Sequence, residues 1–176
     1  MKTFALTAAA ALMATTAFAQ SAAESTGLNS VTGTPPKTED FVMEAASSDM
    51  FEIESSKLAV ERADEETKAF AQQMIADHQK TSDELKQLVE GGQVQATIPT
   101  SMMEAHQEQL ADLQALQGEE FTEAYQDAQE EVHEDAVDLF QRYGSEGDNA
   151  ELKAWAAKTV PALEHHLQMA EELNAD

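Results

Sequence analysis

Residues 70–92 read FAQQMIADHQKTSDELKQLVEGG, and this stretch decides the fold. Its apolar residues recur every three or four positions, which predicts one long amphipathic helix that ends at the pair Gly91-Gly92. His78 falls within the apolar stripe, directly after Asp77. Because an unpartnered buried imidazole costs free energy, His78 needs a partner from elsewhere in the chain.

The same helical periodicity continues on both sides of this stretch, and no segment has the pattern of a strand. Long helices are predicted at residues 39–61, 65–90, 119–143 and 148–173. Thr38 and Asp64 are placed as N-caps of the first two, and a shorter helix is predicted to start at Ser101 and end at Gly118. This shorter helix would return the chain to the other end of the bundle. We therefore predict an all-α, ferritin-like four-helix bundle with an extra short crossover helix.

The N-terminal part of the chain has a different character. Residues 1–19 combine a basic residue, an apolar run too short to anchor in a bilayer, and a small-residue motif that ends at Ala19. This layout predicts a secretory signal peptide that is cleaved after Ala19. Residues 20–37 are small and polar, which predicts a flexible leader. The bundle would then occupy residues 38–176 of a periplasmic or secreted protein.

The chain is strongly acidic, with 34 Asp and Glu against 10 Lys and Arg and a formal net charge of −24. This balance excludes nucleic acid as a partner, because binding it needs cationic patches. It attracts metal ions or a basic partner, although acidic helix faces also keep an exported protein soluble. The absence of cysteine excludes disulfides and thiolate ligands. No transmembrane segment is predicted in the mature chain, and a homo-oligomer is left open.

Inward polar residues on four different helices predict a metal site: Glu52, His78, His133 and His166. At 1.5 Å per residue, the first three lie about 17 to 20 Å from the starts of their helices, whereas His166 lies at about 25 Å. Helical bundles hold transition metals with such inward histidines and carboxylates. We predict one zinc, copper, nickel or iron ion. The other two histidines face outward by helical phase and are predicted to lie at the surface: His106 and His165.

Two acids next to these histidines, Asp77 and Glu130, are predicted to support the ligands. Glu130 and His133 form a Glu-x-x-His motif, but a di-iron centre needs this motif on two helices, so a ferritin-type centre is not predicted. The alternative is a metal-free structural or envelope-stress interaction protein whose inner histidines form a polar network with Glu52. No catalytic arrangement is recognisable, so an enzyme is the less favoured interpretation.

Four segments carry a resemblance to a known family: FVMEAASSDMFEIESSKLA, FAQQMIADHQKTSDELKQL, LQGEEFTEAYQDAQEEVHEDAVDLF and LKAWAAKTVPALEHHLQMA. The sequence resembles a secreted bacterial family of unknown function, whose ferritin-like domain is often labelled an outer membrane protein. The recurring positions of that family match Glu52, Asp77, His78, Tyr125, His133, Pro161 and His166. Val160 and Thr122 stand where Leu and Asp are more usual. The resemblance implies a periplasmic ferritin-like bundle and brings no established activity.

Overall fold

The structure is a computed structural model that describes residues 28–175. The predicted signal peptide (residues 1–19), its cleavage after Ala19 and the first part of the predicted leader lie outside the described residues. The later part of that leader contains a short helix, α2 (Leu28–Thr32), which the sequence pattern did not predict. Within residues 28–175, no helix combines the length and the apolar character that crossing a bilayer requires.

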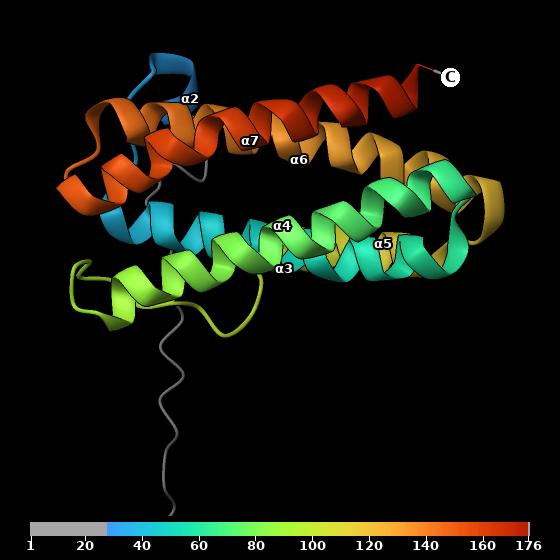
Figure 1. Cartoon of the computed structure of the whole chain (residues 1–176), viewed down its shortest axis with the longest axis horizontal. Coiled ribbons are helices and arrows are strands. Elements are labelled where there is room, and N and C mark those ends of the chain that lie inside the picture. The colour runs from blue at the N-terminus through green and yellow to red at the C-terminus, as the bar shows by residue number, and fades with distance from the viewer. Residues whose placement is uncertain (1–27, 176) are drawn as a thin grey trace, which may run out of the picture.

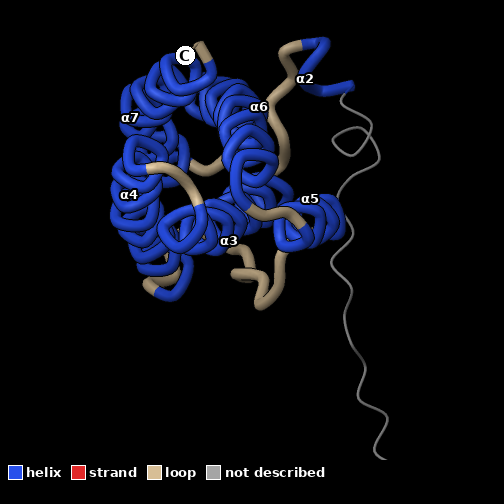
Figure 2. Tube along the Cα trace, turned by 90° about the vertical axis from the view of Figure 1, so that its right-hand side faces the viewer, coloured by secondary structure: helices blue, strands red, loops and turns tan. Residues whose placement is uncertain are grey.

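Four long helices and one shorter helix build the bundle. They are α3 (Thr38–Arg62), α4 (Glu65–Glu90), α5 (Glu104–Ala115), α6 (Gly118–Glu146) and α7 (Ala150–Asn174). Figure 1 shows α3 and α7 running one way along the bundle and α4 and α6 running the other way. The segment after α4 and then α5 carry the chain back to the end where α6 begins, and α5 lies outside the four long helices in Figure 2. This confirms an all-α bundle with a short crossover helix.

Local sequence signals correctly place both ends of α4. The Asp64 carboxylate accepts a hydrogen bond from the Thr67 backbone N–H at 2.9 Å, as expected of an N-cap. The helix gives way to Gly91, whose N–H bonds the Gln87 carbonyl. The predicted short turn before α4 therefore forms, and it makes α3 and α4 antiparallel neighbours.

Two other predicted helix starts are wrong, because polar groups there have partners in other helices. The Thr38 hydroxyl bonds the Tyr143 hydroxyl of α6, so it does not cap α3, which begins at Thr38 itself. The short helix α5 begins three residues after the predicted Ser101. Just before it, the Met103 backbone N–H donates to the Ser47 hydroxyl of α3 at 2.8 Å. That bond docks the chain on α3 before the helix starts.

The core consists of two apolar clusters, one toward each end of the bundle. The first includes Phe41, Leu85, Phe140 and Trp155, and the second includes Phe51, Phe70, Phe121 and Tyr125. Each long helix passes from one cluster to the other at an inward polar side chain: Asp49 on α3, His78 on α4, His133 on α6 and His166 on α7. A buried polar layer therefore crosses the middle of the bundle, with apolar side chains on both sides.

A close approach between α6 and α7 helps to position two of these histidines. A Cβ atom at Gly144 of α6 would lie 2.9 Å from the Ala157 backbone nitrogen of α7, which is too close for a side chain. Glycine therefore lets the two backbones meet near one end of the helix pair. His133 and His166 then face each other from these two helices.

Candidate metal centre

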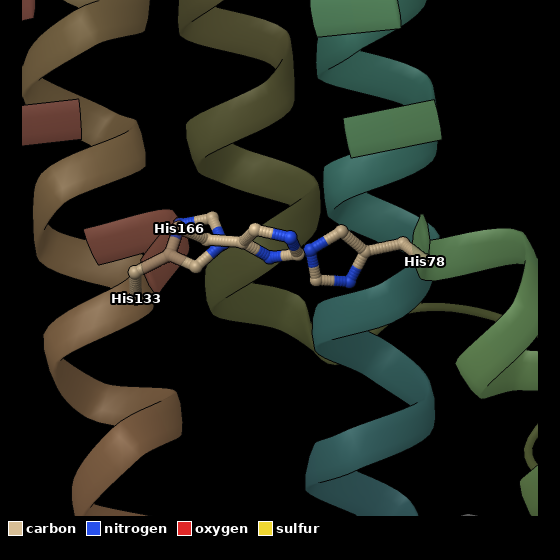
Figure 3. A group of neighbouring side chains, drawn as sticks. All are labelled: His78, His133 and His166. Carbon is tan, nitrogen blue, oxygen red and sulfur yellow. The ribbon is translucent and has the colours of Figure 1, made fainter. Parts of the chain in front are cut away.

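Three histidines meet in the buried polar layer, one from each of α4, α6 and α7. One ring nitrogen each of His78, His133 and His166 lies within 4.8 Å of those of the other two. Their ring centroids are 5.5 to 5.6 Å apart, and the residues are 3%, 1% and 4% exposed. Figure 3 shows the three rings converging with nitrogens toward one another. The spacing allows one ion to contact all three.

His166 reaches this layer although the sequence placed it more than a helical turn too far along its helix. That estimate assumed that all helices start in one plane. Figure 1 shows that α7 starts farther out at its end of the bundle than α3 does. In addition, α7 begins at Ala150 rather than at the predicted Asp148. Both differences bring His166 level with the other two histidines.

One nitrogen of each ring is fixed by an oxygen acceptor. The bonds are His78 Nδ1 to the Asp49 carboxylate at 2.8 Å, His133 Nδ1 to the Gln129 carbonyl at 2.8 Å, and His166 Nε2 to the Asp77 carboxylate at 3.1 Å. Since carbonyl and carboxylate oxygens only accept, each of these nitrogens carries the proton and donates. In a neutral ring, the other nitrogen then carries the lone pair. Such outer hydrogen bonds are the ones that orient histidines bound to a metal.

The remaining three nitrogens have no hydrogen-bond partner within the described part of the chain. They are His78 Nε2, His133 Nε2 and His166 Nδ1, and all three are buried. Buried polar atoms are nearly always satisfied, so an unpartnered atom requires an explanation. Here three unpartnered nitrogens lie in the same buried layer, and each belongs to a ring that is held by a hydrogen bond at its other nitrogen. Such a group of imidazole nitrogens can bind a metal ion.

Glu52 adds a carboxylate to the same layer. It is fully buried, and neither carboxylate oxygen has a hydrogen-bond partner among the described residues. Its Oε1 lies 3.9 Å from His133 Nδ1, the outer nitrogen that bonds the Gln129 carbonyl. Among the described residues, the ligand atoms that lie within 4.8 Å of one another come from the three histidines and not from Glu52. Burial raises the pKa of Glu52 to about 7, although the nearby His78 and the side-chain amide of Gln129 partly oppose this shift. Such a carboxylate can bind a cation as an anion, or stay protonated when none is bound.

The protonation of the three histidines follows from their surroundings. Burial, reinforced by His78, lowers the pKa of His133 to about 3. Burial and His78 also lower the pKa of His166, despite its bond to Asp77. For His78, burial acts to lower the pKa, but the Asp49 hydrogen bond and nearby carboxylates outweigh it and raise the pKa. At neutral pH, His133 and His166 are therefore neutral, the form that binds metals.

The two predicted supporting acids differ in their contacts. Asp77 holds His166, as described above. Glu130 instead accepts a hydrogen bond from Asn174 at 2.6 Å, at the surface of the bundle. The sequence pattern could not separate these cases, because both acids precede a histidine within one helical turn.

Of the two histidines predicted to lie at the surface, only His165 does. The prediction for His106 is wrong. Its Nδ1 lies 2.7 Å from the Ser47 hydroxyl, and its ring stacks on Phe51 with centroids 5.4 Å apart. The side of α5 that carries His106 packs against α3, and only the tertiary arrangement determines this.

Asp49 is the residue of this site that the sequence analysis missed. Its carboxylate accepts hydrogen bonds from Thr81 at 2.9 Å and Ser82 at 3.0 Å, besides the bond from His78. A signal was available, because Asp49 lies three residues before Glu52 and so shares its helix face.

The chain is similar in fold to a solved structure and matches the model of a protein family. A solved structure with a similar fold is "CopM in the Cu(II)-bound form", with a TM-score of 0.66 and 14% sequence identity, covering 80% of this chain and 97% of that one. At that identity the likeness is one of fold. No curated protein matches the sequence. The family model described as "Domain of unknown function (DUF4142)" matches residues 17–173, nearly the whole chain, which bears out the resemblance to a family of unknown function. The chain therefore belongs to the DUF4142 family.

Proposed function

We propose that this protein binds one transition-metal ion through His78, His133 and His166, with Glu52 supplying a carboxylate. The observation that carries the proposal is the meeting of three buried imidazoles, which offer one nitrogen each within 4.8 Å of the others and which each have one unpartnered nitrogen. A metal-free polar network would instead pair these nitrogens with one another or with Glu52. Among the described residues no such hydrogen bond is present, which favours the metal.

The chemical nature of the proposed ligands limits which metal ions the site can bind. Three imidazoles and a carboxylate suit zinc, copper, nickel or iron, whereas magnesium and calcium prefer a full shell of oxygens. A protein with a similar fold has been solved in a Cu(II)-bound form, so Cu²⁺ is the first ion to test. We place this function in the periplasm, as the N-terminal sequence predicts. There the acidic surface would raise the local concentration of cations.

The test uses protein exported to the periplasm and purified without an affinity tag or a chelator. Elemental analysis is expected to find close to one metal ion per chain. In metal-stripped protein, adding Cu²⁺, Zn²⁺, Ni²⁺ or Fe²⁺ in turn should raise the melting temperature for the ion that fits, because binding to the folded state alone stabilises it. No bound ion and no rise with any of the four would overturn the proposal and leave the metal-free network.

Asp49→Asn is expected to weaken metal binding by roughly tenfold to a hundredfold, the usual cost of losing an outer hydrogen-bond partner of a ligand. The Asp49 carboxylate orients His78 and makes the ring's other nitrogen a stronger ligand for a metal ion. A neutral amide at this position orients the ring less firmly and strengthens the ligand less. The measurement is a competition titration against a metal indicator of known affinity. Asp83→Asn, at a neighbouring exposed position, removes the same charge and should bind like wild type. Equal affinity in the two variants would contradict a role for Asp49.

A further inference from the structure

A pocket of about 220 Å³ lies between α4 and α7 beside the triad. Two of the three proposed ligands, His78 and His166, form part of its wall, together with Asp77 and the exposed residues Ala162 and His165. A second pocket of about 250 Å³ lies between the same two helices and has none of the three histidines in its lining. The two pockets therefore form a natural comparison.

The ring of His166 lies between the first pocket and the interior of the site. Its Nε2 donates to Asp77, whose side chain is 43% exposed, while its Nδ1 is buried without a partner. The same ring thus has one nitrogen bonded to a partly exposed carboxylate and the other directed inward. The ring therefore stands at the inner end of the pocket, with one nitrogen on each side. His133 does not line the pocket, which is consistent with approach from the α4–α7 side.

The wall of this pocket contains two acids and two lysines, and the lysines are exposed to water. Glu84 is engaged by the Trp155 indole N–H at 2.9 Å and lies 3.9 Å from the Lys158 ammonium, whose side chain is 75% exposed. Lys80 is exposed, so its ammonium can extend into water. Of the carboxylates in the pocket wall, Asp77 is the one that bonds a histidine of the triad. A cation that enters therefore meets a carboxylate immediately before it meets His166.

We propose that this pocket is the access route by which a divalent transition-metal ion reaches and leaves the triad, with His166 as the movable side chain at its inner end. The inference rests on the proposed metal binding and adds to it a defined path. It makes a kinetic prediction that coordination alone does not make. An obstacle in the path changes the barrier for loading and for release equally, and leaves the two end states unchanged.

The obstacle is Ala162→Phe, at an exposed position of α7 in the pocket wall. Metal-stripped protein is mixed rapidly with Cu²⁺ carried by a coloured indicator, and release is then followed after adding excess chelator. We expect both rates to fall by about tenfold, an increase of about 1.4 kcal/mol in the barrier, with Kd unchanged. Ala162→Leu should give a smaller change in the same direction. Ala69→Phe makes the same substitution at an exposed position in the wall of the second pocket and should match wild type.

The outcomes separate this inference from the proposed function. Equal slowing of loading and release in Ala162→Phe, but not in Ala69→Phe, supports the route. Wild-type rates in Ala162→Phe overturn it, because the ion then enters elsewhere. Slower loading without slower release also overturns it, since Kd would then have changed with the coordination itself. If wild-type protein binds no Cu²⁺, Zn²⁺, Ni²⁺ or Fe²⁺, the proposed function itself fails.

Discussion

His133→Ala is expected to abolish the metal-dependent rise in melting temperature that wild-type protein shows. An ion present at about 100 times its Kd stabilises the folded state by about 2.7 kcal/mol, which for a chain of this size is a rise of about 5 to 10 °C. His133 supplies one of the three inner nitrogens, and its bond to the Gln129 carbonyl orients it for that purpose. Without it, two imidazoles and a carboxylate remain, and the rise disappears at the same metal concentration.

His165→Ala is the matched control for this loss. It removes an exposed imidazole next to His166 and leaves the triad intact, so the metal-dependent rise should be that of wild type. The comparison is between melting temperatures with and without metal for each variant, because truncating a buried side chain also lowers the baseline. A full rise in His133→Ala would contradict the triad, and loss in His165→Ala would mean that the ion binds at the surface.

The fold was predictable because its signals are local. The spacing of apolar residues identifies each long helix, and Asp64 and Gly91 mark where α4 starts and stops. Helical phase also placed Glu52 and His78 on inward faces, and both are buried. These inferences need only one helix at a time.

The rest of the site depends on how the helices are placed relative to one another. The predicted height of His166 along the bundle is wrong because it was counted from the start of α7. Where α7 starts relative to the other helices depends on how the helices pack. The partner of His78 could not be read from the sequence, since Asp49 reaches it only when α3 and α4 pack at this register. Helical phase alone predicts His106 at the surface, because nothing in α5 itself indicates which of its faces meets α3. Helical periodicity in the sequence predicts that a side chain points inward. Which residues it then contacts depends on how the helices pack.

Glu52→Gln is expected to stabilise the metal-free protein, and to do so increasingly as the pH rises. Burial raises the pKa of Glu52 from 4.5 to about 7 in the folded state. Between these values the unfolded chain has lost this proton while the folded chain keeps it, so the wild-type protein loses stability as the pH rises from 4.5 to 7. Glutamine does not ionise. The variant and wild type should therefore be similar near the lower pH and differ by about 3 kcal/mol above the higher one.

Denaturant unfolding of metal-stripped protein across this pH range measures the difference. The contributions of His133 and His166 are present in both proteins, so they largely cancel in the comparison. The contribution of His78 changes with Glu52, because the Glu52 carboxylate helps to raise the pKa of His78. Glu134→Gln removes the same charge from an exposed position beside His133 and should stay within about 0.5 kcal/mol of wild type at every pH. A difference between Glu52→Gln and wild type that does not depend on pH would mean that Glu52 is ionised in the folded protein throughout.

Glu52→Gln should also weaken metal binding. A gain in stability without metal together with a loss of metal binding distinguishes a metal ligand from a polar residue with a structural role alone. A carboxylate that only fixed the helix register would contribute hydrogen bonds, yet neither oxygen of Glu52 has a hydrogen-bond partner among the described residues. Its burial without a partner costs stability, and a bound cation would offset that cost. Glu52→Gln is therefore expected to melt at a higher temperature than wild type without metal at pH 8, and to lose most of the metal-dependent rise. A variant that gained stability and kept the full rise would show that the ion is held by the three histidines alone.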